Sequence, residues 1–347
     1  MKTETETIVV GAGPCGLFQI FELGLLDIKC CVIDSLKRVG GQCSTLYADK
    51  PIYDIPGYPV VGAQELIDQL EKQASPFEAQ YILGQQVQSV EKRDDGRFDV
   101  KTSGGCEFDA GSIVIAGGLG AFDARPLRTP GAANHEGKNL NYHVANKENY
   151  RGKKVAILGG GDSALDWALE LHGIAERVVL VHRRPDFRAQ VASVNRMKQI
   201  AGDESSSMEY HIGRISGLIE HDRVLKGINV MSFDDPPQRT DVEFDELLVF
   251  YGLSPNLGPI AEWGLQVERK NIAIDPQDSQ TNVPGIFAVG DIATYPGKKK
   301  LILSGFHEAA MAAFGVQHYL YPEVKQRLQF TTTSPLMHER LKVDGSL

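Results

Sequence analysis

Two glycine-rich segments of the chain have the residue types and the spacing that bind a dinucleotide. The first, Gly11-Ala12-Gly13-Pro14-Cys15-Gly16, directly follows the apolar run Ile8 to Val10. In this G-x-G-x-x-G pattern the first glycine permits a tight turn, the second lets the backbone approach a pyrophosphate, and the third lets the helix pack on the strand. Asp34 ends the next apolar run, where a carboxylate can accept hydrogen bonds from ribose hydroxyls. The residues expected to bind this nucleotide are Gly11, Gly13, Pro14, Gly16 and Asp34.

The second segment, Gly159-Gly160-Gly161-Asp162-Ser163-Ala164, repeats the pattern with alanine at the third small position. The strand expected after it ends in His182-Arg183-Arg184, and Arg188 follows shortly afterwards. A carboxylate here would repel a 2′-phosphate, whereas guanidinium groups bind one through paired hydrogen bonds. A solvated basic turn is the alternative interpretation of the arginines. The pattern favours NADP(H), bound by Gly159, Gly161, Ser163, His182, Arg183, Arg184 and Arg188.

Each glycine segment is expected to lie in a β-α-β unit, because strand-like apolar runs flank it on both sides. The first unit covers Thr7 to Asp34 and the second covers Lys153 to Arg184. The periodicity further predicts a helix over 63–73, a helix from about Gly305, and strands around 86–90, 97–101, 112–115 and 247–250. Two copies of one supersecondary unit predict an α/β protein with two nucleotide-binding domains.

The composition of the 347-residue chain fits two globular domains and disfavours several other classes of protein. The net charge of −9 argues against a nucleic-acid-binding protein, whose binding surface would be basic. The apolar stretch from Ile8 to Leu26 is interrupted by glycine and proline and lacks a basic segment before it. It therefore predicts neither a signal peptide nor a membrane span, and the expected compartment is the cytoplasm.

Five cysteines are present, and none is spaced as a C-x-x-C pair or in a pattern typical of a zinc site. Free and mostly buried thiols in a reducing compartment are therefore expected, and no metal site is predicted. The cysteines are Cys15, Cys30, Cys31, Cys43 and Cys106.

The two glycine segments, the run from His182 to Arg188 and the pair Gly290-Asp291 together resemble the thioredoxin-reductase-like flavoproteins over essentially the whole chain. In that family the Gly-Asp turn holds the ribityl chain of FAD, which implies this role for Asp291. The resemblance also implies two Rossmann-like domains with short antiparallel β connections. The FAD-binding domain would be discontinuous, with residues 1–117 and 252–347, and the NADPH-binding domain would be residues 118–251.

Thioredoxin reductases proper carry a redox-active C-x-x-C before the strand of the NADPH domain, where this chain has Tyr142-His143-Val144-Ala145. Without two thiols beside the flavin, electrons cannot pass by dithiol–disulfide exchange. The segments Gly40–Tyr47, Tyr53–Pro59 and Gly290–Lys298 more closely resemble the ferredoxin–NADP⁺ reductases of the thioredoxin-reductase-like type.

This closer resemblance implies further FAD-binding residues in the first domain. Gln42, next to Gly41, would hydrogen-bond the flavin, and Tyr47 would stack on one face of the isoalloxazine ring. Val87 would contact the adenine through its backbone, and Phe122 would line the flavin pocket. Without the resemblance, Tyr47 has the alternative interpretation of an ordinary half-buried tyrosine.

In the same group of reductases the C-terminal segment crosses to the partner subunit of a homodimer and covers the other face of the flavin. Phe330 is the candidate for this second stacking ring, and Thr332 is expected near the polar edge of the flavin. If Phe330 covers that face, it must move aside for the nicotinamide.

The resemblance implies an FAD-dependent ferredoxin–NADP⁺ reductase, which exchanges a hydride with NADP(H) and single electrons with ferredoxin or flavodoxin. Because the flavin carries the chemistry, no side chain is assigned as general acid or base. Two alternatives stay open: an NADPH-dependent reductase of quinones or another small acceptor, and an FAD-binding protein without turnover. Ferredoxins are typically acidic, so the run Lys298 to Lys300 is a candidate docking surface, with a solvated loop as the alternative.

Overall fold

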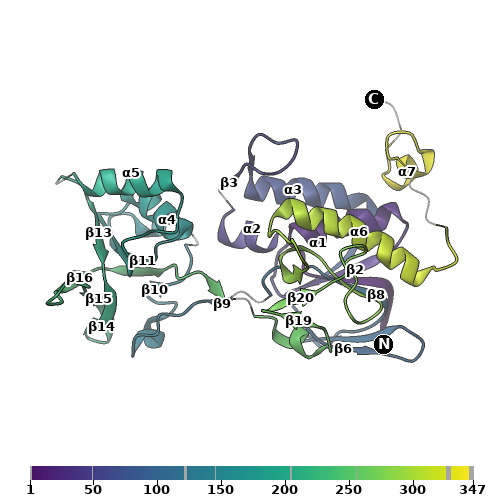
Figure 1. Ribbon diagram of the computed structural model, residues 1–347, viewed down its shortest axis with the longest axis horizontal. Helices are drawn as coiled ribbons and strands as arrows, with labels where there is room; N and C mark the ends of the chain where they lie inside the picture. Colours follow the sequence, from purple (N-terminus) through teal and green to yellow (C-terminus); the bar gives the residue numbers. More distant parts are fainter. Residues whose placement is uncertain are drawn as a thin grey trace. The chain divides into compact units, whose positions relative to one another are not determined.

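The computed structural model describes residues 2–48, 50–120, 123–144, 146–203, 205–254, 256–325 and 330–343. The chain divides into two compact units (Figure 1). Unit 1 combines two segments, Met1–Phe122 and Pro255–Leu347, and unit 2 is Asp123–Ser254. These limits follow from how the chain packs. Which cofactor each unit binds stays a prediction.

Unit 1 is built on a seven-stranded sheet in the order β5-β2-β1-β8-β7-β6, with β21 beside β8. The parallel strands are β1 (Thr3–Val10), β2 (Cys30–Asp34), β5 (Gln80–Leu83), β8 (Glu107–Ile115) and β21 (Ile286–Ala288). The antiparallel strands are β6 (Val87–Lys92) and β7 (Phe98–Thr102). Val9 lies level with Val32 and Val114, so β1, β2 and β8 end at one edge of the sheet.

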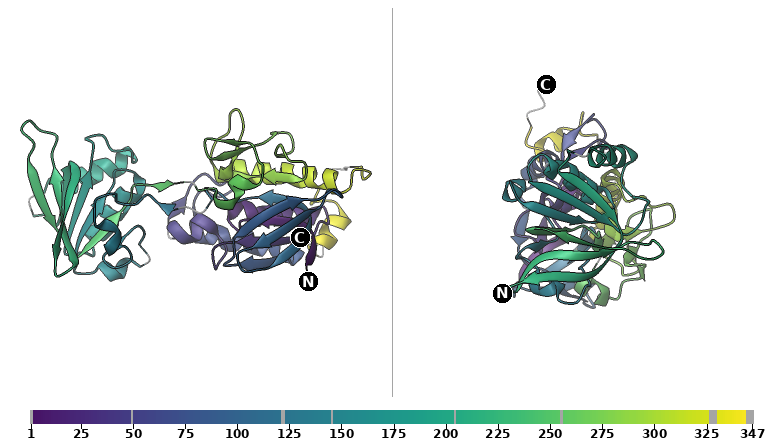
Figure 2. Two further views of the ribbon diagram at one scale, coloured as in Figure 1. Left: turned by 90° about the horizontal axis from the view of Figure 1, so that it is seen from below. Right: turned by 90° about the vertical axis from the view of Figure 1, so that its left-hand side faces the viewer.

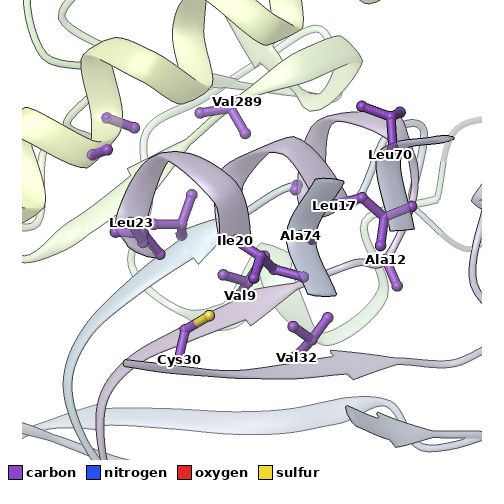
Figure 3. Close-up of a cluster of buried hydrophobic side chains, with 14 of the residues drawn as sticks. Val9, Ala12, Leu17, Ile20, Leu23, Cys30, Val32, Leu70, Ala74 and Val289 are labelled. Carbon is purple, nitrogen blue, oxygen red and sulfur yellow. The ribbon is translucent and has the colours of Figure 1, made fainter. Parts of the chain in front are cut away.

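Three helices, α1 (Pro14–Leu25), α3 (Ala63–Ala74) and α6 (Ile302–Leu320), cover one face of this sheet (Figure 1). Ile20 of α1 packs on Val9 and Val32 of the sheet, and Cys30 points into the same cluster (Figure 3). Burying an aliphatic side chain of this kind stabilises the fold by about 1.5–3 kcal/mol. The sequence prediction of a helix over 63–73 is confirmed.

A small sheet of β19 (Val267–Glu268), β20 (Asn271–Ala273) and β22 (Ala293–Thr294) belongs to the other face of the large sheet. Ile272 and Trp263 pack there with Ile113 of β8. The remaining elements of unit 1 are α2 (Gly41–Leu46), α7 (Pro335–Arg340), β3 (Pro51–Ile52), β4 (Val61–Gly62), and the 3₁₀ turns η1 (Ser75–Phe77), η4 (Gly258–Glu262) and η5 (Gly290–Ile292).

Unit 2 contains a five-stranded parallel sheet in the order β10-β17-β11-β12-β13. Its strands are β10 (Leu140–Asn141), β11 (Lys154–Leu158), β12 (Arg177–His182), β13 (Met208–Ile212) and β17 (Glu246–Val249). Its helices are α4 (Asp162–His172) and α5 (Val191–Ala201), with the 3₁₀ turns η2 (Ala132–His135) and η3 (Lys147–Tyr150).

An antiparallel sheet of β14 (Arg214–His221), β15 (Val224–Met231) and β16 (Arg239–Glu243) packs on the parallel sheet of unit 2 (Figure 2). Ile228 and Val230 of β15 share a buried cluster with Val179 of β12. The sequence patterns did not predict this sheet. A further antiparallel pair joins β9 (Asp123–Ala124) to β18 (Leu253–Ser254).

One sequence expectation needs correction. The helix expected from about Gly305 begins earlier, at Ile302, so Gly305 lies within its first turns and packs against Cys15. The C-terminal helix α7 packs on α1, where Arg340 donates a hydrogen bond to the Leu25 carbonyl oxygen, and its Met337 is buried. Among the described residues, no helix is long and apolar enough to cross a membrane.

Candidate functional site

The first glycine turn connects β1 to α1 at the carboxyl edge of the unit 1 sheet. Gly11 has a φ of +109°, and a Cβ atom there would lie 2.5 Å from the Ala116 carbonyl oxygen. A Cβ atom on Gly16 would lie 1.9 Å from the carbonyl oxygen of Gly11. Any larger residue at either position would therefore open the turn. Pro14 begins α1, so the amide groups of the first helical turn are directed at the loop.

Asp34 ends β2 beside this turn and is held by two backbone groups. Its carboxylate accepts hydrogen bonds from the amides of Ala12 at 2.6 Å and Leu36 at 2.7 Å. Burial raises the pKa of Asp34 above its ordinary value, while these two hydrogen bonds act in the opposite direction. The carboxylate therefore lies fixed at the edge where a ribose would follow the diphosphate.

The segment around α2 packs on the same turn, backbone against backbone. The amide of Gly40 donates to the Ala12 carbonyl oxygen at 2.8 Å. A Cβ atom on Gly41 would lie 3.1 Å from Cα of Gly13, and one on Gly13 would lie 3.9 Å from Cα of Gly41. The two glycines thus form a cradle without side chains at the beginning of α1. Such a cradle fits the close approach of a diphosphate.

Tyr47, Cys43 and Asp291 come together next to the cradle. The Cys43 thiol donates to the Tyr47 hydroxyl at 3.6 Å. Burial raises the pKa of Tyr47 well above its ordinary value, and the charge of Asp291 adds to this effect. Gln42 lies beside Gly118, since a Cβ atom on Gly118 would be 3.5 Å from Nε2 of Gln42. The structure therefore places Tyr47 near Asp291, and Gln42 beside Gly118, in unit 1.

The turn that carries Asp291 is supported by a buried ion pair that sequence reasoning missed. Oε2 of Glu308, on α6, accepts a hydrogen bond from the Gly290 amide at 2.8 Å. Its Oε1 accepts from the Tyr295 hydroxyl at 2.8 Å and from the ammonium group of Lys298. The side chains of Lys298 and Glu308 are only 5% and 3% exposed. An acidic residue among the small, buried residues of α6 was the signal that could have revealed this arrangement.

This ion pair corrects the sequence expectation for the run Lys298 to Lys300. Lys298 was expected on a docking surface or a solvated loop, and both interpretations are wrong for this residue. Its ammonium group is buried against Glu308, whereas Lys299 and Lys300 are exposed. Asn271 supports the same turn, because its Nδ2 donates to the Asp291 carbonyl oxygen at 2.6 Å.

The remaining FAD candidates of the first domain are Val87 and Phe122. Val87 begins β6 and is buried, and the amide of Gln85, two residues before it, donates to the Asp34 carbonyl oxygen at 3.0 Å. Val87 is thereby brought near the end of β2, and its contact with an adenine stays a prediction. Phe122 lies outside the described residues.

Phe330 and Thr332 lie away from this region within the chain. Both are exposed, Phe330 by 66%, on the segment that leads into α7. Because α7 packs at the carboxyl end of α1, this segment is near the end of α1 opposite the glycine turn. Their expected contact is with the flavin of a second subunit, so it stays a prediction.

The second glycine turn connects β11 to α4 in unit 2. A Cβ atom on Gly159 would lie 2.6 Å from the Phe250 carbonyl oxygen, and one on Gly160 would lie 2.3 Å from the His182 ring. A Cβ atom on Gly161 would meet no described atom within 4 Å, so the turn is open there. Ser163 is exposed in the first turn of α4. Close packing on one side and open space on the other fit a nucleotide diphosphate at this helix start.

The loop after β12 carries the three arginines and is attached to the glycine turn by its backbone. The Arg188 amide donates to the Gly160 carbonyl oxygen at 2.7 Å, and the Gln190 amide donates to Oδ1 of Asp162 at 2.8 Å. Burial lowers the pKa of His182, and the charges of the neighbouring arginines lower it further. The structure therefore gathers the predicted NADP(H) residues of unit 2 around one turn.

The three guanidinium groups of this loop are exposed. Among the described residues, none forms an ion pair or a side-chain hydrogen bond, so all three are free to bind an anion. The arginines are Arg183, Arg184 and Arg188.

Comparison with known proteins identifies the chain's relatives. Residues 5–313 match the family described as pyridine nucleotide-disulphide oxidoreductase. A protein of Cupriavidus taiwanensis named ferredoxin–NADP reductase 2 is 57% identical over 342 residues, which cover 99% of this chain and 92% of the relative. A protein of Methylibium petroleiphilum named ferredoxin–NADP reductase is 53% identical, over 98% of this chain and 93% of the relative.

Solved structures show the same fold at lower sequence identity. A thioredoxin reductase of Lactococcus lactis, in a conformation designated FR, matches with a TM-score of 0.76 and 23% identity, over 92% of this chain and 99% of that one. The bacillithiol disulfide reductase of Staphylococcus aureus matches with a TM-score of 0.74 and 16% identity, over 91% of this chain and 98% of that one. Because residues 5–313 match its family model and the two reductases above are 57% and 53% identical to this chain, the protein belongs to the pyridine nucleotide-disulphide oxidoreductase family.

Proposed function

We propose that the protein is an FAD-dependent ferredoxin–NADP⁺ reductase that moves electrons between NADP(H) and ferredoxin or flavodoxin. The proposal rests mainly on the side chains that follow the second strand of each β-α-β unit, which have opposite charges in the two units. Asp34 follows the first glycine turn, whereas three exposed arginines follow the second. A carboxylate suits a ribose with free hydroxyls, and guanidinium groups suit a ribose that carries a 2′-phosphate. The names of the relatives support the choice of acceptor.

In this proposal unit 1 binds FAD through the backbone cradle of Gly13 and Gly41, with Asp34 on the ribose. Asp291 would hold the ribityl chain, and its turn is supported by Glu308. Gln42, which lies beside Gly118, and Tyr47, whose pKa the charge of Asp291 helps to raise, would contact the ring system. The residues of unit 1 thus bind and orient the cofactor, and Tyr47 excludes water from one side of it.

Unit 2 would bind NADP(H), with the diphosphate at the start of α4 and the 2′-phosphate on the arginine loop. His182 covers Gly160 and keeps the turn compact. When bound, the flavin supplies both the acceptance of a hydride and the release of single electrons. Protein groups need only to bring the two cofactors into contact and exclude solvent.

Thiols do not relay electrons in this proposal. The chain has no C-x-x-C pair, and its five cysteines are free. Burial raises the pKa of Cys15 and Cys30 to about 12, so both stay protonated at neutral pH. A protonated thiol is a poor nucleophile for disulfide exchange. Free thiols also support a cytoplasmic location.

We further propose a homodimer in which Phe330 and Thr332 of one subunit reach the flavin of the other. The ring of Phe330 is 66% exposed and is therefore available for such a contact.

The proposal can be tested by following flavin absorbance in a stopped-flow instrument. The purified holoenzyme is mixed with NADPH or with NADH, and oxidised ferredoxin is then added. We expect NADPH to bleach the flavin much faster than NADH does, and ferredoxin to restore the colour. Bleaching without electron delivery to ferredoxin would favour a reductase of quinones or other small acceptors. An absence of bleaching would leave an FAD-binding protein without turnover.

A further inference from the structure

The basic run Lys298 to Lys300 is divided by the fold into one structural lysine and two surface lysines. Lys298 is buried in its ion pair with Glu308. Lys299 and Lys300, which precede α6, have exposed side chains. The buried pair thus fixes the backbone from which the two exposed cations extend.

A second basic segment meets these lysines from elsewhere in the sequence. β19 and β20 form a hairpin whose turn consists of Arg269 and Lys270, and both residues are exposed. The ammonium group of Lys300 donates to Oδ1 of Asn271, the first residue of β20, at 3.3 Å. Residues that are distant in sequence therefore form one basic surface, consisting of Arg269, Lys270, Lys299 and Lys300.

This basic surface borders the region that we assign to the flavin. The side chain of Asn271 links the two, since its Oδ1 accepts from Lys300 while its Nδ2 donates to the Asp291 carbonyl oxygen at 2.6 Å. β20 also pairs with β22, which directly follows the Asp291 turn. A carrier bound on this surface would lie next to the cofactor site of unit 1.

We propose that the basic surface, through Arg269, Lys299 and Lys300, is the docking site for the acidic face of a small one-electron carrier. This inference rests on the proposed function and adds the surface that the partner uses. Charge complementarity supports it, because the whole chain has a net charge of −9 and would otherwise repel an acidic protein. The exposed side chains of Leu301 and Leu303 follow the lysines and supply the apolar contacts that accompany charged groups in interfaces.

The exposed arginines of unit 2 have a different assignment. The arginine loop of unit 2 surrounds the second glycine turn, where its guanidinium groups would be engaged by the 2′-phosphate of NADP(H). An acidic carrier bound there would compete with the nucleotide. The basic surface of unit 1 contains none of these arginines.

The experiment compares two double charge reversals of equal size. Lys299→Glu with Lys300→Glu alters the basic surface. Lys29→Glu with Lys72→Glu is the matched control, since both lysines are exposed and lie in unit 1. Lys29 precedes β2 at the end opposite Asp34, and Lys72 is in the last turn of α3. Each holoenzyme is assayed with NADPH, once with an oxidised acidic bacterial ferredoxin and once with menadione, an uncharged quinone, at low and high salt.

We expect the Lys299/Lys300 variant to lose roughly tenfold in kcat/KM for ferredoxin at low salt, because charge steering of association contributes at least this factor. The loss should shrink at high salt. Menadione reduction should stay within about twofold for both variants, and the control should retain its rate with ferredoxin, because isolated surface charges contribute little.

Three outcomes would overturn the docking site. They are an equal loss of ferredoxin reduction in the control variant, an equal loss of menadione reduction in the Lys299/Lys300 variant, and a loss that does not depend on salt. A wild-type enzyme that reduces menadione but transfers no electrons to ferredoxin would instead refute the proposed function, and the docking site with it.

Discussion

Replacing the buried Lys298 by methionine should destabilise unit 1 by about 3 kcal/mol. Removing one partner of a buried ion pair typically costs about 3–5 kcal/mol, because the other charge stays in the interior without compensation. Glu308 would keep its hydrogen bonds from the Gly290 amide and the Tyr295 hydroxyl, which places the expected cost near the lower limit. For a domain of this size the melting temperature should fall by about 6–12 °C.

The assay is the temperature at which the flavin leaves the holoenzyme, followed by its fluorescence. Lys300→Met, the same chemical change at an exposed position two residues away, is the control and should stay within about 0.5 kcal/mol of the wild type. Adding Glu308→Gln to Lys298→Met removes the uncompensated charge and keeps an amide oxygen for the Gly290 amide. The double variant should therefore recover part of the loss.

A melting temperature for Lys298→Met that matches the Lys300→Met control would refute this reasoning. It would mean that the Glu308 carboxylate is adequately solvated or protonated without its partner. Equal instability of the double variant and Lys298→Met would show instead that packing around Lys298, and not its charge, supports the turn.

Three other variants test separate parts of the structure. Changing Arg183 and Arg184 to alanine should raise KM for NADPH by about tenfold or more, since a charged hydrogen bond contributes about 1.5–3 kcal/mol; an equal rise for NADH in the same steady-state assay would contradict the 2′-phosphate assignment. Burial raises the pKa of Glu22 from 4.5 to about 7, so its ionisation destabilises the fold as the pH rises between these values. Glu22→Gln should therefore raise the melting temperature at pH 8 more than at pH 4.5, and equal shifts in calorimetry would argue against this. Phe330→Ala should tighten nicotinamide binding and alter turnover of the holoenzyme without changing its stability; unchanged kinetics and binding would count against a flavin-covering role.

The sequence was most informative where function depends on local backbone geometry. Gly11 and Gly16 must be glycine because a Cβ atom would collide with backbone atoms that are close in the chain or on the adjoining strand. Such local constraints can be recognised from the spacing of glycines in the sequence. The ends of β2 and β12 were predicted for the same reason. Asp34 and the arginines follow apolar runs that mark a strand without knowledge of the rest of the fold.

What escaped prediction depends on partners that are distant in sequence. Nothing near Lys298 shows that its ammonium group is buried, because Glu308 becomes its partner only when α6 packs under the Gly290 turn. Asn271 likewise joins the site only because β20 pairs with β22. The sheet of β14, β15 and β16 was missed in part because β14 is only partly buried and its pairing with β15 is irregular, with bulges near Ile215 and Ile219.

The way in which the arginine loop is attached has a consequence for how nucleotide preference can evolve. Main-chain bonds from Arg188 and Gln190 hold the loop on the glycine turn, and the guanidinium groups take no part in holding it. Their side chains can therefore be exchanged without displacing the scaffold that presents them. Point substitutions of the arginines could therefore change the preference for NADP(H) over NAD(H) during evolution. The backbone of the loop and of the glycine turn would keep its structure.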